Sequence, residues 1–358
     1  MVRKLIAVAI SGGVDSSTAA LLLKKSGHEV IGFHMRLWYD EWTQTNTQQS
    51  LNKPETAIDR AEQACHAIGI PFHIIDLRVA FKNLVVDYFC RGYGKGRTPN
   101  PCIVCNKYIK FGLLLEKAIT FGADFLATGH YARIEHFDGA YHLLKGVDTT
   151  KDQSYVLYTL GQEKLRQVLF PLGDFSKVKV RQIARQNGLP AATVKGSQDI
   201  CFIDGRYNDF LSRNIDAGIP GEIINDKGEV LGRHRGIPFY TIGQRHRLGI
   251  AAGQRLYVTK IEPKDNRIVV GNEEELYSQK LIAEGVNWIL GKPDTDSLDI
   301  TAKIRYKSPD MAVTIYPKTD GARVNFHQPE RAVTPGQSIV FYKNSEVIGG
   351  GTIETAEK

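Results

Sequence analysis

The sequence predicts an α/β fold, a doubly wound parallel sheet, followed by two small β-rich domains of which the last is a β-barrel. From residue 1 to about 130, short apolar runs alternate with helical patterns, as in a parallel sheet covered by helices. From about residue 206 onward, turn signals recur among short alternating runs, which is typical of small β structures. A chain of 358 residues can form two or three domains, and we place them at 1–205, 206–278 and 279–358.

The first strand is expected at residues 5–10, where a short continuous apolar run is typical of a buried parallel strand. Residues 18–25 then have the pattern of a helix that ends at Gly27. The remaining strands of the sheet are predicted at 29–33, 72–77 and 124–128, and the helices between them at 54–67, 79–90 and 107–121. In the β-rich part, strands are predicted at 337–342 and 347–353, turns at 225–228 and 320–321, and a loop at 291–294.

The turn between the first strand and the first helix, S-G-G-V-D-S-S at 11–17, is the most informative segment. Gly12 and Gly13 let backbone N–H groups converge at a helix N-terminus, which favours an anion there, and the serine hydroxyls add donors. Asp15 is suited to orient a metal ion or a ribose. The alternative is a tight turn with an ordinary helix cap, since serine and aspartate are common capping residues. The chain has no G-x-x-x-x-G-K-[ST] motif, which excludes a Walker-type phosphate loop.

Two further segments are expected beside this turn. They are 33–35 and 128–130, each at the end of a predicted strand. Because parallel strands place their carboxyl ends at one edge of the sheet, the three segments should converge there.

Basic residues outnumber acidic residues by 46 to 39, a net charge of +7, which favours a polyanionic partner. Two dense groups suggest nucleic acid, with a solvated charged face as the alternative. They are Lys177, Lys179, Arg181, Arg185 and Lys195, and Arg233, His234, Arg235, Arg245, His246 and Arg247. No apolar run approaches the length of a membrane span, and glycines interrupt the N-terminal apolar stretch, unlike a signal peptide. We therefore expect a cytoplasmic protein with no membrane partner.

Five cysteines, an odd number, indicate reactive thiols or metal ligands rather than a disulfide framework. Cys102 and Cys105 lie in a stretch rich in glycine and proline, which predicts a loop. Cys201 follows a basic stretch, and a nearby Lys or Arg would lower its pKa and favour the thiolate. Cys65 and Cys90 lie in helical patterns and are expected to be buried. The C-x-x-C pair could be redox-active, structural or half of a zinc site, although a second ligand pair is absent.

The first loop resembles the pyrophosphate loop of the ATP pyrophosphatases, and further motifs narrow the resemblance. The whole chain is similar to the tRNA-specific 2-thiouridylases, whose motifs follow one another in order along it. They are S-G-G-V-D-S-S at 11–17, T-P-N-P-C-I-V-C-N-K at 98–107, A-T-G-H-Y-A-R at 127–133, K-D-Q-S-Y at 151–155, G-S-Q-D-I-C-F-I at 196–203, Y-T-I-G-Q-R at 240–245, L-G-I at 248–250, V-T-P-G-Q at 333–337 and G-G-G-T-I at 349–353. The first loop alone would not separate this family from argininosuccinate, NAD or lysidine synthetases. The resemblance implies a first domain of the adenine nucleotide alpha hydrolase-like, PP-loop type.

The resemblance further implies ATP-dependent 2-thiolation of the wobble uridine, position 34, of tRNA. The uridine O2 would be adenylated by ATP with Mg²⁺, releasing pyrophosphate, and a persulfide sulfur would then replace AMP. The matching makes Cys201 the persulfide carrier and Cys105 the nucleophile, which can pair with Cys201 in a disulfide. The implied partners are tRNAs for Lys, Glu and Gln, and a sulfur-relay protein or cysteine desulfurase.

The same matching implies binding roles for further residues. Those for ATP are Ala9, Ile10, Ser11, Gly12, Gly13, Val14, Asp15, Ser16, Met35 and Gly129. Those for the target base are Asn100, Pro101 and Cys102, and those for the rest of the tRNA are Lys151, Asp152, Gln153, Arg305 and Tyr306. From the residues alone, 151–153 could equally be an ordinary turn before a helix.

Position 102 departs from part of the family, which has an aspartate there, proposed as a proton-transfer group. Here the residue is Cys102, so a carboxylate role is not carried over. With Cys105 and Cys201 it could form a set of three thiolates able to hold an iron–sulfur cluster. Two other function classes stay open. A small-substrate synthetase on the same ATP-binding fold would not need the cysteines, and a non-catalytic tRNA-binding or redox module would release no pyrophosphate.

Overall fold

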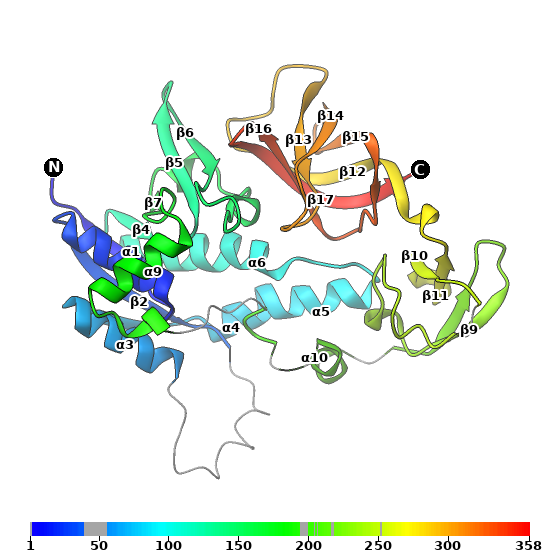
Figure 1. The fold of residues 1–358 in the computed structure, drawn as a ribbon, viewed down its shortest axis with the longest axis horizontal. Coiled ribbons are helices and arrows are strands. Elements are labelled where there is room, and N and C mark those ends of the chain that lie inside the picture. The colour runs from blue at the N-terminus through cyan, green and yellow to red at the C-terminus, as the bar shows by residue number, and fades with distance from the viewer. Residues whose placement is uncertain are drawn as a thin grey trace, which may run out of the picture. The chain divides into compact units, whose positions relative to one another are not determined.

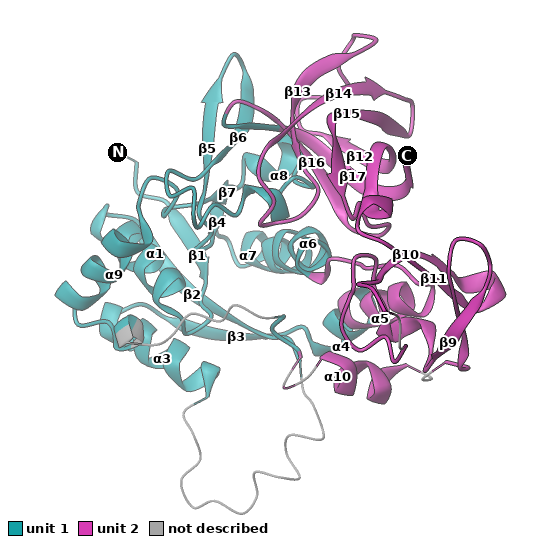
Figure 2. Ribbon diagram, turned by 45° about the vertical axis from the view of Figure 1, so that its right-hand side comes forward, with its two compact units in different colours: residues 1–84, 102–202, 345–347 teal, residues 85–101, 203–344, 348–358 magenta. Residues whose placement is uncertain are grey.

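The computed structural model describes residues 2–38, 56–193, 200–203, 205, 207–215, 218–250 and 253–358. These residues form two compact units, coloured separately in Figure 2. Unit 1 contains Met1–Leu84, Cys102–Phe202 and Ser345–Val347, and unit 2 contains Val85–Pro101, Ile203–Asn344 and Ile348–Lys358. Residues 54–55, at the start of a predicted helix, and Lys195 lie outside the described residues.

Unit 1 is built around a parallel sheet with the strand order β3-β2-β1-β4-β7 (Figure 1). Its strands are β1 (Leu5–Ala9), β2 (Glu29–Arg36), β3 (Phe72–Asp76), β4 (Phe125–Ala127) and β7 (Val168–Leu169). The chain order reverses at β1, which has β2 on one side and β4 on the other. Sheets of this kind bind ligands outside the carboxyl ends of the strands at this reversal. The loop after β1 therefore lies where the fold is suited to bind a ligand.

Helices cover both faces of this sheet. On one face lie α1 (Val14–Lys25), α3 (Ala57–Ile68) and α9 (Lys177–Gln186), which are grouped together in Figure 2. Their side chains share one apolar core with Ile6 and Val8 of β1. On the other face, Phe33 of β2 packs edge-on against Phe121, at the end of α7 (Leu115–Thr120), with ring centroids 5.4 Å apart. This arrangement confirms the predicted doubly wound α/β fold.

The ends of α3 show how local sequence defines a helix. Thr56 accepts a hydrogen bond from the backbone N–H of Asp59, whose carboxylate accepts one from the backbone of Thr56 in return, a capping box. Gly69 ends the helix in the left-handed conformation, with φ +72°. Between these ends, the face with Ala61 and Ile68 is buried. The helix therefore begins and ends where its own sequence provides caps.

Helical structure covers more of residues 78–120 than the sequence predicts. Its parts are α4 (Arg78–Phe81), the π-helical segment Lys82–Val86, α5 (Asp87–Gly94), α6 (Pro101–Val104), the π-helical segment Cys105–Leu114 and α7. The predicted loop around Cys102 and Cys105 is wrong, because both residues are helical. Pro101 occupies the first helical position, where its missing N–H has no intrahelical partner to lose. There, a proline begins a helix instead of preventing one.

Unit 1 also contains elements that the sequence analysis missed. A hairpin is formed by β5 (Ala132–Phe137) and β6 (Ala140–Lys145), with Asp138 and Gly139 both at positive φ in its turn. An Asp-Gly pair between alternating runs is a strong hairpin signal, so this element was accessible to sequence reasoning. The remaining elements are α8 (Gln162–Leu165) and the 3₁₀ turns Ser154–Val156 and Pro190–Thr193.

Unit 2 begins with α5 and includes α10 (Tyr207–Asn214), whose Tyr207 and Phe210 rings both pack against Phe89. A small sheet follows, with the strand order β10-β11-β8-β9. Its strands are β8 (Gly221–Ile224), β9 (Val230–His234), β10 (Tyr257–Glu262) and β11 (Arg267–Gly271). The predicted turn at 225–228 joins β8 to β9, which confirms that prediction.

The rest of unit 2 is a closed barrel. Its strands, in order around the barrel, are β12 (Tyr277–Trp288), β15 (Gly321–Arg331), β14 (Met311–Pro317), β13 (Leu298–Lys303), β16 (Ser338–Lys343) and β17 (Glu346–Glu357), and β17 pairs with β12 to close it. The interior is filled by apolar side chains such as Leu281, Val324 and Phe341. The two predicted strands near the C-terminus correspond to β16 and β17. The predicted β-rich second half with a final barrel is therefore confirmed.

Within the described part of the chain, every helix is too short or too polar to cross a membrane.

Candidate active site

The loop after β1 is shaped by glycine. Gly12 has φ +76°, and a Cβ added there would lie 2.6 Å from the carbonyl oxygen of Ala57 on α3. Any larger residue would therefore have to move the backbone of α3 or of the loop. On the other side, the N–H of Ile10 donates to the carbonyl of Phe33 at 2.8 Å and joins the end of β1 to β2. The loop thus has one tightly defined path from the strand to the helix.

Helix α1 begins directly after this loop, with Gly13 as its N-cap and no side chain capping its first N–H groups. The serines instead bond among themselves. The Ser16 hydroxyl accepts from the N–H of Ser11 at 3.1 Å and lies 3.2 Å from the Ser11 hydroxyl. The hydroxyl of Ser17 donates back to the carbonyl of Gly13. An uncapped helix N-terminus with hydroxyls beside it presents N–H donors and positive potential to an anion.

Asp15, in the first turn of α1, is held by two side chains from distant parts of unit 1. Its carboxylate accepts hydrogen bonds from Lys177 Nζ at 2.5 and 2.6 Å and from the Tyr131 hydroxyl at 2.7 Å. The burial of Tyr131, together with its hydrogen bond to Asp15, raises the pKa of the phenol. The ion pair places the Lys177 ammonium beside the loop at 11–17, which we call the phosphate loop after the anion site that the sequence predicts there. The ammonium is therefore positioned to contact a polyphosphate bound by this loop.

Segment 128–130 contacts both this loop and the π-helical segment Cys105–Leu114, which we call the cysteine helix. A Cβ on Gly129 would lie 2.8 Å from the backbone nitrogen of Ser16, so Gly129 lies against the N-terminus of α1. The next residue, His130, packs its ring against Phe111 in the π-helical segment, with centroids 5.8 Å apart, and bonds Thr128 at 2.7 Å. Burial holds the pKa of His130 well below its usual value, and the charge of Lys110 adds to this effect. One short segment therefore contacts both the phosphate loop and the helix that carries Cys105.

Met35 lies in β2, two residues beyond Phe33, which pairs with Ala9 at the end of β1. It is partly exposed, while its neighbour His34 is buried and bonds the carbonyl of Ile10 through Nδ1 at 2.9 Å. The predicted convergence of three segments at one sheet edge is therefore what the structure has. The assigned contacts with ATP themselves stay a prediction.

The three cysteines of interest all belong to unit 1. Cys102 lies in α6 and Cys105 begins the π-helical segment, one helical turn later, so the two face the same side. Cys201 lies in a turn whose next residue, Phe202, is buried against Phe81 and Trp38. The thiols of Cys102 and Cys201 both act electrostatically on Cys105, so the fold brings the three together. All are free thiols, and Cys65 and Cys90 are buried, as predicted.

A nearby cation was expected to lower the pKa of the Cys201 thiol, but the net shift of this pKa is upward. Burial raises the pKa of Cys105 to about 12 and also raises those of Cys102 and Cys201, although these two side chains have exposed surface. Lys110 acts in the opposite direction on all three thiols, but desolvation outweighs it. In this state the thiols are protonated at neutral pH. A change at the site, such as binding a charged ligand, is needed to favour the thiolates.

Lys110 follows Cys105 by five residues, the spacing of one hydrogen-bonded turn in a π-helix. It is partly buried, and no carboxylate among the described residues pairs with it. Lys110→Met should raise the pKa of the three thiols further. At a pH below the pKa of a given thiol, its alkylation by iodoacetamide should then be about threefold slower or more. The pH dependence of labelling at each cysteine, read by peptide mass spectrometry, measures this. Lys107→Met, on the exposed side of the same segment, is the control. Identical pH profiles for Lys110→Met and the wild type would contradict the role.

The iron–sulfur hypothesis finds no support in this geometry. Within the described residues, no group of three or more His, Cys, Asp or Glu side chains is arranged to hold a metal ion. Cys102, Cys105 and Cys201 are therefore close enough to interact electrostatically but are not placed as a ligand set.

The segment that leads to Asn100 is held inside unit 2. The N–H of Thr98 donates to the carbonyl of Pro335 at 3.0 Å, and the Gln337 side chain donates to the carbonyl of Thr98 at 2.8 Å. The hydroxyls of Thr98 and Thr241 are 3.2 Å apart. Two of the motifs that carry the family resemblance, at 240–245 and 333–337, therefore position the stretch before the residues assigned to the target base.

Two other segments were assigned to tRNA, and most of their side chains have structural partners. In unit 1, the buried Asp152 accepts bonds from the N–H groups of Gly146 and Ser154, and Gln153 accepts one from the N–H of Tyr131, while Lys151 is exposed. In unit 2, Arg305 and Tyr306 are exposed. The Arg305 guanidinium donates to the carbonyls of Arg331 at 2.5 Å and of Ala332 at 3.2 Å. Both segments are ordered turns that present a basic side chain, and their contact with tRNA stays a prediction.

Sequence reasoning missed Lys177, Tyr131 and Lys110 as parts of the site. Lys177 was grouped with a basic cluster on the same helix, and nothing local to it indicates Asp15. For Lys110 a signal was present, because a lysine in the C-N-K-Y-I-K run lies one or two helical turns after Cys105.

Three family models match the chain in order. The tRNA methyl transferase HUP domain matches residues 4–205, the tRNA methyl transferase PRC-barrel domain residues 208–272, and the aminomethyltransferase beta-barrel domain residues 278–353. Among solved structures, a predicted subunit of tRNA methyltransferase from Methanocaldococcus jannaschii has 19% identity and a TM-score of 0.31, covering 51% of this chain and 76% of its own. At this TM-score the likeness supports no conclusion about the chain.

Curated relatives match nearly the full length. The tRNA-specific 2-thiouridylase MnmA of Moorella thermoacetica is 46% identical over 97% of this chain and 99% of its own length. Those of Pelotomaculum thermopropionicum and Acetivibrio thermocellus are 46% and 44% identical over 99% of this chain, and over 98% and 100% of their own lengths. With this identity over the whole length, and with the phosphate loop and the cysteines in place, the chain belongs to the tRNA-specific 2-thiouridylase family.

Proposed function

We propose that the protein converts the wobble uridine, position 34, of tRNA to 2-thiouridine, using ATP and a cysteine persulfide and producing AMP and pyrophosphate. The observation that carries this proposal is segment 128–130, which contacts both the phosphate loop, through Gly129, and the cysteine helix, through His130. A nucleotide site and a thiol site joined in this way suit a reaction that activates a carbonyl and then attacks it with sulfur. The names of the relatives agree with this reaction.

In the first step, the uridine O2 attacks the α-phosphorus of ATP and pyrophosphate leaves. We assign the phosphates to the loop at 11–16, with Ala9, Ile10, Met35 and Gly129 around the nucleotide, and Mg²⁺ entering with ATP. The uncapped N-terminus of α1 and the Lys177 ammonium supply positive potential where negative charge builds up on the leaving group. A uridine carbonyl is a poor electrophile, and the adenylate gives it a leaving group.

In the second step, the terminal sulfur of a Cys201 persulfide attacks C2 of the adenylated uridine and AMP leaves. The thiolate of Cys105 attacks the Cys201 sulfur, which breaks the persulfide bond and forms a Cys105–Cys201 disulfide. The sulfur thus remains on the uridine, and a thiol reductant must reopen the disulfide before the next cycle. The electrostatic interaction between the two thiols supports this assignment, because the exchange requires the two sulfurs to meet.

The substrate and partners follow from the same chemistry. The target base must leave the anticodon stack to reach the thiols, and we assign it to Asn100, Pro101 and Cys102. We assign the surrounding tRNA to Lys151, Asp152, Gln153, Arg305 and Tyr306. The tRNAs for Lys, Glu and Gln are the proposed substrates, and a sulfur-relay protein or cysteine desulfurase would reload Cys201. We divide the chain into a catalytic domain at 1–205, a central domain at 206–278 and a barrel domain at 279–358.

The test is nucleoside mass spectrometry of unmodified tRNA incubated with the protein, ATP, Mg²⁺ and a desulfurase with cysteine. 2-Thiouridine should appear only when ATP and the sulfur source are both present, with one pyrophosphate released for each thiouridine formed. Pyrophosphate release with a small amide-accepting substrate and none with tRNA would favour the small-substrate synthetase. Neither product under any condition would contradict the proposed reaction.

A further inference from the structure

The central part of unit 2 carries an unusual concentration of positive charge. From Val230 to Ile261 the chain has no Asp or Glu, but it has five arginines and one lysine. Three of the arginines, Arg245, Arg247 and Arg255, lie within one short segment just before β10. A run of this kind repels itself, and the repulsion is relieved when a polyanion binds.

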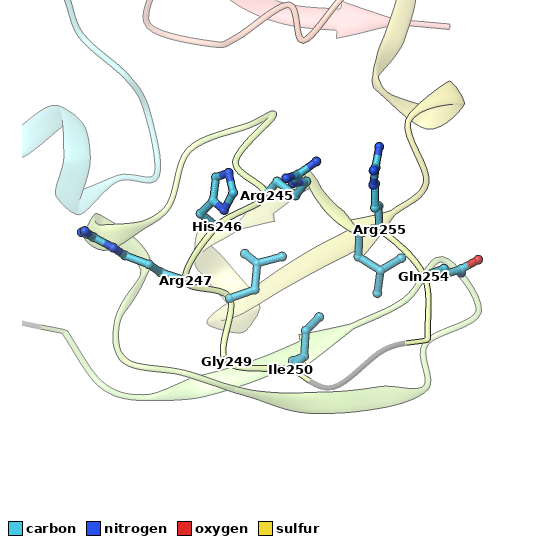
Figure 3. Close-up of a pocket in the computed structure, with 9 residues that line it drawn as sticks. Arg245, His246, Arg247, Gly249, Ile250, Gln254 and Arg255 are labelled. Carbon is cyan, nitrogen blue, oxygen red and sulfur yellow. The ribbon is translucent and has the colours of Figure 1, made fainter.

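The described residues of this segment, 245–250 and 254–256, line a pocket of about 360 Å³ (Figure 3). Leu248 and Leu256 are buried within it, while the three arginines and His246 are exposed. In Figure 3, the side chains of Arg245 and Arg255 lie at the upper edge of the view of the pocket, and the side chain of Arg247 extends to the left. The pocket therefore combines an apolar base with cationic groups at its rim.

The pocket has a defined conformation. The Gln244 side chain accepts from the N–H of Thr241 at 3.2 Å and donates to the carbonyl of His246 at 3.1 Å. Arg247 has φ +62°, a left-handed conformation that an arginine rarely adopts. At Gly232 of β9, a Cβ would lie 2.7 Å from Ile250, so the missing side chain leaves space for the segment to pack on the sheet. The stretch 244–250, which carries Arg245 and Arg247, is thus packed in place.

The pocket arginines differ from other arginines of unit 2. Arg331 pairs with Glu273 at 3.2 Å, and Arg267 pairs with Glu222 at 3.1 Å. Among the described residues, by contrast, no carboxylate or carbonyl pairs with the guanidinium of Arg245, Arg247 or Arg255. Arginine is the side chain best suited to bind phosphate through two parallel hydrogen bonds. Its unpaired groups at this rim are therefore available to a ligand.

We propose that this pocket binds the phosphodiester backbone of RNA, as a contact of the tRNA substrate outside the reacting nucleotide. The inference rests on the proposed function for the identity of the RNA. Three guanidiniums spread around one rim suit several consecutive phosphates better than a single small anion. A phosphate contact is sequence-independent, so the pocket would add affinity without selecting the anticodon.

The test compares two triple variants that change the net charge equally. The pocket variant carries Arg245→Gln, Arg247→Gln and Arg255→Gln. The control carries Lys227→Gln, Lys264→Gln and Lys292→Gln, at exposed turns of the same unit. All six side chains are exposed, so both variants should fold, which circular dichroism and thermal melting check. Affinity for unmodified tRNA is then measured by fluorescence anisotropy across a series of KCl concentrations.

The pocket variant should bind tRNA at least tenfold more weakly, and its slope of log K against log salt should fall by about 2, since each phosphate contact contributes about 0.7–0.9. The control variant should retain nearly the wild-type slope. Equal behaviour of the two variants would overturn the proposal. The proposal would also be overturned if inorganic phosphate stabilised the wild type but not the pocket variant while the two bound tRNA equally well. The pocket would then be a site for a free anion.

These outcomes are separable from those of the proposed function. If the wild type forms 2-thiouridine and the pocket variant binds tRNA normally, only the pocket inference fails. If the wild type binds tRNA through the pocket but forms no 2-thiouridine, the reaction fails and the pocket stands.

Discussion

Cys201→Ser should abolish 2-thiouridine formation, by about 10³-fold or more, while ATP-dependent pyrophosphate release and tRNA affinity stay within about twofold of the wild type. A serine hydroxyl cannot form a persulfide, so the sulfur has no carrier. The substitution replaces sulfur by the smaller oxygen in a side chain that is already exposed, and the neighbouring Phe202 keeps the turn anchored between Phe81 and Trp38. Nucleoside mass spectrometry and a pyrophosphate assay on the same samples measure the two steps separately.

The control for thiol removal is Cys90→Ala, since Cys90 is a buried packing residue on α5. It should lower thermal stability slightly and leave both reactions intact. Loss of tRNA binding in Cys201→Ser would mean that Cys201 is a binding residue and not the sulfur carrier. Retained thiolation would exclude the persulfide assignment altogether.

Asp15→Asn should reduce pyrophosphate release by about 10²-fold or more, and 2-thiouridine formation with it. Asparagine keeps the shape of the side chain but removes the charge that holds the Lys177 ammonium at 2.5 and 2.6 Å. The Lys177 side chain is only 16% exposed, so its ammonium loses a partner that water replaces incompletely. A release assay with ATP and tRNA measures the effect, and persulfide loading of Cys201 should be unchanged.

A double-mutant cycle tests whether Asp15 and Lys177 act as a unit. Lys177→Met should match Asp15→Asn, and the double variant should be no worse than either single variant. Lys179→Met, on the exposed side of the same helix, should leave release unchanged. Unchanged ATP turnover in Asp15→Asn would show that the ion pair only stabilises the loop.

The two substitutions are expected to separate the steps of the proposed reaction. Asp15→Asn blocks adenylation before sulfur is used, whereas Cys201→Ser blocks sulfur transfer after pyrophosphate has left. If a variant of Asp15 still released pyrophosphate but formed no 2-thiouridine, Asp15 would act in sulfur transfer and not in adenylation.

Predictions from the sequence succeeded where the signal was local. The apolar run of β1 and the glycines after it each act within a few residues. The same holds for the turn at 225–228 and for the alternating strands β16 and β17. Predictions were less accurate where a local signal had two interpretations. The prolines near Cys102 indicated a loop, but Pro101 begins a helix.

Local sequence was sufficient for the α/β class and for the strand, loop and helix at the N-terminus, because short-range periodicity and glycine positions define them. The roles of the cysteines come from the resemblance to the family and stay predictions. Long-range packing was required for the electrostatics of the site. Lys177 is 162 residues from Asp15, and its ammonium reaches the loop only after α9 has packed on α1. Likewise, the thiol pKa depends on how deeply the fold buries Cys105, and burial there outweighs the charge of Lys110. Burial and distant ion pairs result from the assembled core, so no window of the sequence contains them.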